Sequence, residues 1–351
     1  AQDRKAHPYA NFSADVNAGS TQNFANNLNS SQNDFLTNTF RSNIRYSRSF
    51  YDSPWSFSAN AGHDQNSQTG VYNFTLPTLN VNKARTFPLK GVFNDGPKDK
   101  FYEKIGWVWS SAFQNTLSAT ERELALNNWD QLSQKCRNGI RHTTSLSTSL
   151  KAGALSINPS FNYNERWYFK TFGRSFNPET DQFEADTLQG FDRNNDWSFS
   201  TSLTTKLYGM YSFKGKNLKA IRHTLTPTLS YNFRPDFDPN VYGFYGAEGA
   251  LSSYNPNQGT VYGGPPSSNS QTISFSFVNN IEGKFLSKRD TTSKFSKVAF
   301  LENLTFSGNY NFEADSNQLS NLNVSGFTSI SKFADLRFSG IFDPYTYVIS
   351  E

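Results

Sequence analysis

The residues best suited to chemistry in this chain are two histidines in twin contexts. The tetrapeptide IRHT occurs at 140–143 and again at 221–224, so His142 and His223, two of only four histidines, have matching surroundings. A histidine that activates a serine, with a third group to orient it, is the arrangement of many hydrolases. Ser145 follows His142 by three residues, but serine is so abundant here that chance explains the spacing. A lipid hydrolase is therefore one alternative, and a strand-opening repeat is the other.

The remaining chemical motifs are incomplete. The run DRNND at Asp192–Asp196 imitates the start of a calcium-binding loop, but Trp197 replaces the required glycine and Leu203 replaces the closing glutamate. A cation held by a surface loop is what remains of this interpretation. Cys136 is the only cysteine, so the chain has no internal disulfide and no cysteine-based metal site. We therefore expect no enzyme activity, no bound metal and no cofactor.

The segments that carry these residues have a hydrophobic period of two. In TLTPTLSYNF at 224–233, Leu225, Leu229 and Phe233 alternate with threonine, serine and asparagine. The same alternation recurs in four further windows, at 155–163, 197–213, 273–285 and 304–312. Such a pattern predicts strands that have one apolar face and one polar face.

Strand length and composition favour a protein of the outer membrane. Several windows alternate over ten residues or more, and a tilted strand needs about nine to eleven residues to cross a bilayer. The chain is 16% aromatic, with 33 Phe and 17 Tyr, and tryptophans such as Trp107 and Trp167 lie near strand ends, as interfacial girdles require. A formal net charge of +4 gives no reason to expect nucleic acid. We predict an all-β fold, a transmembrane antiparallel β-barrel, and keep a soluble β-protein as an alternative.

About thirteen strands are predicted, near 9–19, 38–50, 54–65, 69–82, 103–118, 142–152, 154–166, 196–213, 219–235, 270–287, 298–313, 318–330 and 335–346. Their connections alternate between short turns and four long segments, 20–37, 119–141, 167–195 and 236–269. Since outer-membrane barrels have short periplasmic turns and long extracellular loops, the long segments are assigned to the outside. The segment 236–269, rich in Gly, Pro, Asn and Ser, is expected to be an exposed loop.

This topology bears on the two histidines and on completeness. The first IRHT enters its strand from a long loop and the second from a short turn, so His142 and His223 are expected at opposite rims and not in one site. Bacterial barrels of this kind have even strand numbers, and thirteen is odd. Residues 1–351 are therefore expected to form part of one outer-membrane β-barrel domain.

Several segments resemble one family of outer-membrane proteins. IRHTLTPTLSYNFRPDF at 221–237 resembles the His-Thr-Leu-x-Pro strand of the LptD family, which assembles lipopolysaccharide in the outer membrane. Other segments resemble the same family and occur in the same order, namely LPTLNVNKARTFPLK, FYEKIGWVWSSAFQN, INPSFNYNERWY, LTTKLYGMYSF and NNIEGKFLSKRDT. The resemblance extends over most of the chain.

The resemblance implies a fold, a location and partners. The family has a barrel of 26 strands preceded by a periplasmic jelly-roll domain, so about 13 of the expected 26 strands are present here, without the jelly-roll. It implies a Gram-negative cell outer membrane, an LptE-like plug lipoprotein and a periplasmic bridge protein that delivers lipopolysaccharide. Lipopolysaccharide would then enter the outer leaflet through a lateral opening, with no covalent chemistry. The paired cysteines of part of the family are reduced to Cys136.

Four arginines are candidates to guide the anionic sugars of lipopolysaccharide through the lumen. By alternation, Arg41 and Arg45 lie on the polar face opposite Ile44, and Arg222 and Arg234 lie on the polar face of their strand. The structural alternative is that these arginines solvate the lumen or pair with carboxylates. The functional alternative to lipopolysaccharide insertion is a porin-type nutrient channel, which would need a constricting loop or a plug; neither is evident in the sequence.

Overall fold

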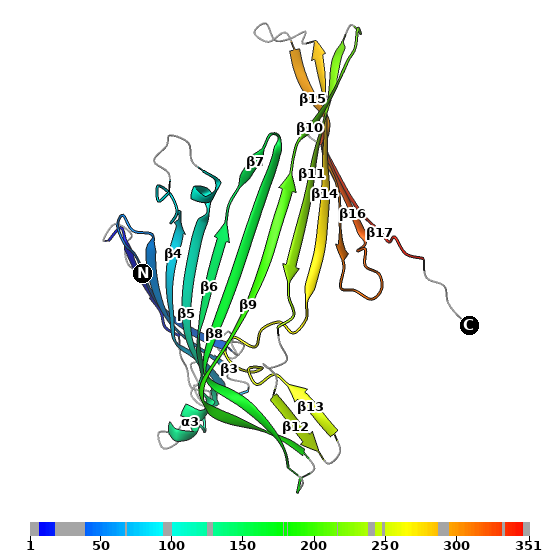
Figure 1. Cartoon of the computed structure of the whole chain (residues 1–351). Coiled ribbons are helices and arrows are strands. Elements are labelled where there is room, and N and C mark those ends of the chain that lie inside the picture. The colour runs from blue at the N-terminus through cyan, green and yellow to red at the C-terminus, as the bar shows by residue number, and fades with distance from the viewer. Residues whose placement is uncertain are drawn as a thin grey trace, which may run out of the picture.

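The computed structural model describes residues 7–17, 39–66, 69–93, 100–124, 129–177, 179–180, 182–215, 217–237, 243–247, 250–286, 295–331 and 334–346. One large antiparallel sheet contains nearly all of them (Figure 1). Two short helices accompany it, a 3-10 turn at Phe101–Lys104 and α3 at Trp129–Lys135. No helix in the described part of the chain has the length and apolar character to cross a membrane.

Thirteen strands follow one another across the sheet, each paired with the next. They are β1 (Ala10–Asp15), β2 (Thr39–Ser49), β3 (Trp55–Asn66), β4 (Val71–Thr86), β5 (Gly106–Thr120), β6 (Arg137–Ser147), β8 (Leu155–Asn177), β9 (Gln182–Thr204), β11 (Leu218–Arg234), β14 (Ser270–Leu286), β15 (Phe295–Asn311), β16 (Leu322–Ser331) and β17 (Ala334–Phe342). Two short strands prolong the ladder beside this path, β7 (Leu150–Ala152) on β8 and β10 (Leu207–Ser212) on β11. A separate hairpin is formed by β12 (Gly243–Ala247) and β13 (Ala250–Tyr254). The predicted all-β antiparallel sheet and its thirteen successive strands are confirmed.

The pairing register sorts side chains into two faces. One row of paired residues, from β8 to β15, is Asn158, Ser202, Ser230, Ser274 and Asn309; the next row is Ile157, Leu203, Leu229, Phe275 and Gly308. Because neighbouring residues of a strand point to opposite faces, one face is small and polar and the other is apolar.

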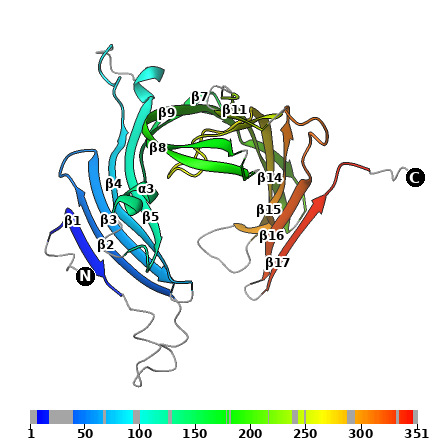
Figure 2. The ribbon, with the colours of Figure 1, turned by 90° about the horizontal axis from the view of Figure 1, so that it is seen from below.

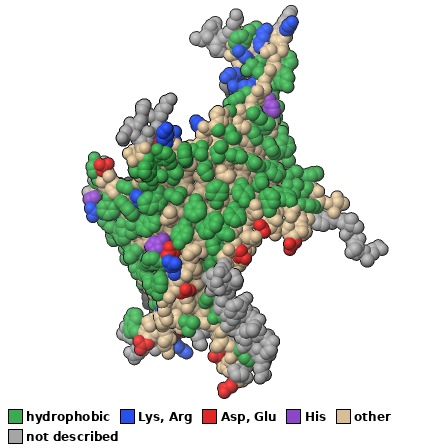
Figure 3. All heavy atoms as spheres, viewed as in Figure 1, with side chains coloured by type: hydrophobic (Ala, Val, Ile, Leu, Met, Phe, Trp, Pro, Cys, Tyr) green, Lys and Arg blue, Asp and Glu red, His purple; other side chains and the backbone are tan. Residues whose placement is uncertain are grey.

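Viewed along the strands, the sheet curves into an open arc with β1 and β17 at its two ends (Figure 2). The convex side carries a broad cover of hydrophobic side chains, with charged side chains towards its upper and lower ends (Figure 3). On this side, large apolar residues remain exposed, such as Leu229 at 43%, Phe277 at 41% and Phe306 at 42%. The polar face therefore lines the concave side.

The sheet has almost no interior of the usual kind. Among the described residues, the buried hydrophobic side chains are Phe40, Ala119, Leu132, Tyr168 and Pro265. A sheet that keeps its apolar face on the outside and its polar face on the inside matches the wall of a transmembrane barrel, whose exterior is solvated by lipid. The chain thus forms part of such a barrel.

One predicted loop is a pair of strands. The segment 167–195 was expected to be a long connection, but β8 and β9 stay paired from Tyr168↔Asp192 out to Asn177↔Gln182. The loop reading was wrong because beyond the apolar band both faces of a strand meet water, so the alternation fades while backbone pairing continues. The predicted connection 20–37 lies outside the described residues.

The segment 236–269 also differs from its prediction. After the β12–β13 hairpin, residues 255–266, here called the inward loop, return to the concave face of the sheet, and Phe172 N donates to Pro256 O at 2.8 Å. Within the inward loop only Gln258 and Gly259 are exposed, and Asn257 is fully buried. The expectation of an exposed loop is therefore wrong for residues 255–266.

Candidate functional site

The concave face is a polar surface built from pairs of small side chains on adjacent strands. Ser160 and Ser200 share a hydrogen bond of 2.6 Å, and Thr204 and Thr228 share one of 3.2 Å. Since the hydroxyls can donate or accept, this wall offers water or sugar hydroxyls many equivalent partners. It is the kind of surface along which a hydrated ligand can move without a deep energy minimum.

The inward loop is fixed to this wall by buried polar contacts. The hydroxyl of Tyr168, which is fully buried, donates to the carbonyl oxygen of Gly263 and lies 3.2 Å from Asn194 Oδ1. Asn257 Nδ2 donates to Asp192 Oδ2 at 3.2 Å, although 65 residues separate the two in sequence. Buried polar groups that satisfy one another hold one specific arrangement, because each group loses its partner if the loop leaves.

An ion pair supports these contacts within the wall. Arg166 Nη1 donates to Asp196 Oδ2, and their side chains are only 12% and 8% exposed. Asn164 Nδ2 donates to the other carboxylate oxygen of Asp196 at 2.9 Å. Asn164 satisfies a further position of the Asp196 carboxylate, as a buried pair of this kind requires, whereas Arg166 Nε is buried without a hydrogen-bond partner in the described part of the chain.

Tyr262 fixes the other end of the inward loop. Its hydroxyl donates to the carbonyl oxygen of Ala112 at 2.6 Å, and the Arg141 guanidinium lies 5.2 Å from its ring centre. Burial raises the pKa of Tyr262 above its usual value, and the nearby Arg141 opposes this effect. Gly139 allows the approach, since a Cβ there would lie 3.1 Å from Val261 Cγ1 and 2.7 Å from the Trp167 carbonyl oxygen.

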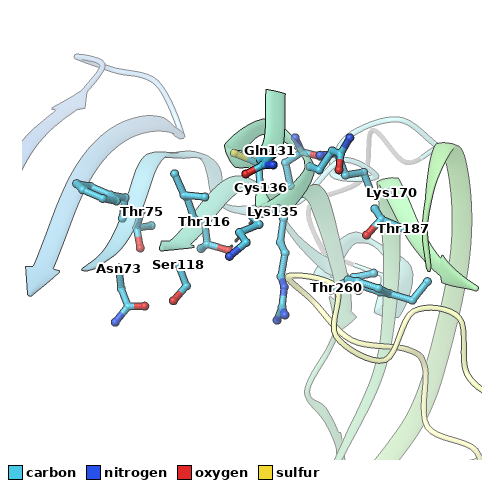
Figure 4. Close-up of a pocket in the computed structure, with 16 residues that line it drawn as sticks. Asn73, Thr75, Thr116, Ser118, Gln131, Lys135, Cys136, Lys170, Thr187 and Thr260 are labelled. Atoms are coloured by element: carbon cyan, nitrogen blue, oxygen red, sulfur yellow. Dashed lines mark hydrogen bonds between the residues drawn. The ribbon is translucent and has the colours of Figure 1, made fainter. Parts of the chain in front are cut away.

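A cavity of about 910 Å³, here called the loop-end cavity, opens beside the inward loop (Figure 4). One wall is formed by β4 and β5, and the other by α3, the start of β6, the β8–β9 strands and Thr260 of the inward loop. In Figure 4, Asn73, Thr75, Thr116 and Ser118 lie on one side, facing Lys170, Thr187 and Thr260 on the other. The cavity lies at the end of the sheet where the long connections gather.

A salt bridge holds α3 beside this cavity. Lys135 Nζ lies 2.6 Å from Glu123 Oε1, and Thr120 N donates to Glu123 Oε2 at 2.9 Å. These hydrogen bonds, the one from Lys135 first, lower the pKa of Glu123 to about 2. Glu123 therefore stays ionised in all ordinary conditions and neutralises Lys135.

The four predicted arginines have different surroundings on the concave face. Arg222 Nη2 lies 2.5 Å from Glu282 Oε2, so this arginine is paired with a carboxylate. Arg234 Nη2 donates to the carbonyl oxygen of Ser268 at 3.2 Å. Arg41 and Arg45 face Asp64 and Asn60 across the sheet, are exposed, and form no ion pair with any described residue.

The structure separates the residues of the hydrolase alternative. His142 pairs in register with Glu165 and packs between Trp109 and Trp167 on the convex face, whereas Ser145, three residues on, points to the concave face. A Ser–His dyad is therefore absent at this position.

The two histidines also lie at opposite ends of the sheet. The row of paired residues through His142 reaches β9 at Asn195, and a second row joins Phe199 of β9 to Phe233 of β11. The first row lies four residues from the second along the strands, and His223 lies ten residues from the second row on its other side. The two histidines are therefore offset by about fourteen residues, or roughly 46 Å, along the strands. The IRHT repeat marks two strands and not one site.

The calcium-like run is part of a strand. Asp192–Asp196 lies within β9, and both of its aspartates already accept hydrogen bonds from protein groups, Asp192 from Asn257 and Asp196 from Arg166. The reading as a cation-binding surface loop is therefore wrong. Elsewhere in the described residues, no group of three or more His, Cys, Asp or Glu side chains is placed to hold a metal ion.

Sequence reasoning missed the residues that hold the inward loop. The sequence YGGPP at 262–266 is typical of an ordinary loop. Tyr168 was interpreted as part of an aromatic girdle, and Arg166 as an ordinary strand residue. One signal was available: Arg166 and Asp196 both lie on polar strand faces, where opposite charges on adjacent strands attract. The register that brings them together is fixed only by the folded sheet.

Comparison with known proteins identifies the family of the fold. A family model described as "LptD protein" matches residues 1–345, nearly the whole chain. No curated protein matches the chain.

Proposed function

The chain belongs to the LptD protein family, and from this premise we propose that it is a subunit of an outer-membrane translocon for lipopolysaccharide. The family supports a role in lipopolysaccharide transport at the Gram-negative outer membrane, as a transport and assembly protein rather than an enzyme. The finer proposal is that the protein inserts lipopolysaccharide into the outer leaflet, without making or breaking covalent bonds.

The two-faced sheet is the observation that carries this proposal. Lipopolysaccharide is an amphiphile, so its sugars need a hydrated route while its acyl chains need contact with lipid. The concave wall of serine, threonine and asparagine can hydrogen-bond the sugars. The convex wall of leucine and phenylalanine contacts the lipid bilayer, where the acyl chains belong. A porin-type channel has the same two faces, so the sheet fits both functions and family membership favours lipopolysaccharide.

A porin-type nutrient channel is the alternative. The inward loop is the kind of constricting element that such a channel would contain, and no sign of it is evident in the sequence. The presence of a constriction therefore no longer separates the two functions, and family membership favours lipopolysaccharide transport. A lipid hydrolase is opposed by the placement of His142 and Ser145 on opposite faces.

The proposal includes partners and further protein segments. Further strands would extend the sheet from its edges towards the 26 strands of the family, and a jelly-roll domain would receive lipopolysaccharide from the periplasmic bridge. An LptE-like lipoprotein would fill part of the barrel. The exposed polar concave face is the surface available to such a plug, because hydroxyl and amide groups there can hydrogen-bond a second protein.

We further propose that inward-facing arginines guide the anionic sugars. Arg41 and Arg45 form no ion pair with any described residue, although Asp64 lies opposite Arg41 in the register, and both can bind phosphate. Arg222 is instead neutralised by Glu282, and Arg234 is held by a backbone carbonyl. Guidance should therefore depend mainly on the first two.

The experiment compares four variants of the full-length protein in cells. Arg41→Gln with Arg45→Gln should slow arrival of new lipopolysaccharide at the cell surface and sensitise cells to bulky hydrophobic antibiotics. Arg222→Gln with Arg234→Gln should do so less. Lys151→Gln with Lys206→Gln, at exposed positions in β7 and between β9 and β10, removes the same charge as a control. Normal delivery in a correctly assembled variant lacking all four arginines would reject the guiding role.

A further inference from the structure

We propose that the loop-end cavity binds an anionic saccharide, the phosphorylated sugar portion of lipopolysaccharide. This inference rests on the proposed function and names the part of the substrate that is recognised. It concerns the residues that line the cavity, which neither the family match nor the sequence patterns assign to a ligand.

The charge of the cavity is positive and partly uncompensated. Of its sixteen lining residues, Lys135, Arg137 and Lys170 are basic and none is acidic. Lys135 is neutralised by Glu123, which lies outside the lining. Arg137 and Lys170 form no ion pair with any described residue, which leaves two positive charges facing one space.

These two cations are also held in place. The Arg137 guanidinium lies 5.7 Å from the ring centre of Phe172, and Lys170 Nζ donates to the carbonyl oxygen of Ser133. A guanidinium stacked on an aromatic ring keeps its N–H groups free at its edge, and an ammonium with one hydrogen bond has two more to give. The arrangement is preorganised for the oxygens of a phosphate.

The neutral lining suits a sugar. Hydroxyl and amide side chains stand on both walls, including Asn73, Thr116 and Ser118 on one side and Gln131 and Thr187 on the other. Each can donate and accept, which matches the hydroxyl groups of a saccharide. Phe172 supplies an apolar surface for the C–H face of a sugar ring. A bare phosphate would need only the cations.

Size and chemistry argue against other ligands. At about 910 Å³ the cavity lies near the upper end of the range for small-molecule sites, so it has room for several sugar units and not only an ion. The absence of acidic side chains in the lining disfavours a metal cation. Acyl chains are disfavoured, because their burial would strip water from the polar walls without replacing its hydrogen bonds.

The test uses purified full-length protein and deacylated lipopolysaccharide, which keeps the sugars and phosphates but lacks the acyl chains. Isothermal titration calorimetry measures affinity, and the rate at which a maleimide modifies Cys136, a residue of the lining, reports whether the cavity is occupied. We expect saturable binding that slows modification of the Cys136 peptide. Arg137→Gln combined with Lys170→Gln should weaken binding about tenfold or more, because two charge-assisted contacts are lost.

Two matched controls sharpen the result. Lys151→Gln with Lys206→Gln removes equal charge at exposed residues outside the cavity and should leave the affinity unchanged. The same saccharide after removal of its phosphates with hydrofluoric acid should bind at least tenfold more weakly. Heat-modifiable migration on gels verifies that each variant is folded.

Three outcomes overturn the inference: no protection of Cys136, equal affinity for the dephosphorylated saccharide, or protection by inorganic phosphate at the same concentrations as by the saccharide. The last outcome would make the cavity a simple anion site. Because these measurements use isolated protein, they are separate from the export assay. A protein that binds no saccharide but is required for surface delivery would overturn only this inference; one that binds but is dispensable for delivery would overturn the proposed function.

Discussion

Two arginine–carboxylate pairs on the concave face differ mainly in burial, which makes them a test of how this wall is stabilised. In one pair, Arg166 and Asp196 are 12% and 8% exposed; in the other, Arg222 and Glu282 are 41% and 28% exposed. Both pairs join adjacent strands. Substitution of each carboxylate by its amide, Asp196→Asn and Glu282→Gln, removes one charge and keeps the shape of the side chain.

The expected costs differ by several kcal/mol. Asp196→Asn leaves the Arg166 charge buried without a counter-charge, and loss of one partner of a buried pair costs about 3–5 kcal/mol. Glu282→Gln leaves Arg222 in contact with water, and an exposed pair of this kind contributes about 0–1 kcal/mol. The difference, about 3 kcal/mol, corresponds to a factor of roughly 150 in the unfolding equilibrium.

The assay is unfolding of the full-length protein in lipid vesicles by guanidinium chloride, followed by tryptophan fluorescence and extrapolated to zero denaturant. Arg166→Gln combined with Asp196→Asn gives the coupling of the pair through a double-mutant cycle. If Asp196→Asn lowers the free energy of unfolding no more than Glu282→Gln does, burial does not decide the strength of these pairs. The inward loop then does not exclude water from the Arg166–Asp196 pair.

Three other predictions follow from the same geometry. Leu229→Arg should destabilise the barrel by about 2–4 kcal/mol, whereas Thr228→Arg on the concave face should cost much less; equal costs in the same unfolding assay would reverse the assignment of the faces. Tyr262→Phe should weaken attachment of the inward loop by about 0.5–1.5 kcal/mol, seen as faster amide exchange in residues 255–266, and unchanged exchange would contradict it. Since the pKa of Tyr262 is raised on folding, its contribution should be complete below the ordinary tyrosine pKa near 10 and should be lost as pH rises through the higher folded value; exchange that is already fast at pH 8 would argue against this hydrogen bond.

The strand wall could be predicted from the sequence because its signal is local. Alternation at 224–233 depends only on which residues are neighbours, and the strand β11 has the predicted register, with Leu229 outward and Ser230 inward. The same pattern gave the count of thirteen successive strands. Boundaries were less accurate: the strand predicted at 142–152 begins at Arg137 in β6, and its last residues form the separate short strand β7.

The inward loop could not be predicted because its partners are remote in sequence. Tyr168 meets Gly263 across 95 residues, and Tyr262 meets Ala112 across 150. A loop rich in glycine and proline looks the same whether it is solvated or packed, since its backbone polar groups need partners in both cases. The difference lies in whether a wall offers those partners, which is a property of the folded sheet.

The positions of the unpaired cations also follow from the fold and not from composition. With nearly balanced charges, a formal net of +4 gives little indication of an anionic ligand. The register, however, pairs Arg166 and Arg222 with carboxylates and leaves Arg45, Arg137 and Lys170 without them, all on the concave side or in the cavity that opens from it. Since an exposed cation without a partner costs little in water but attracts phosphate strongly in a narrow aqueous lumen, such placement favours an anionic cargo. A channel for neutral nutrients would gain no attraction from these cations.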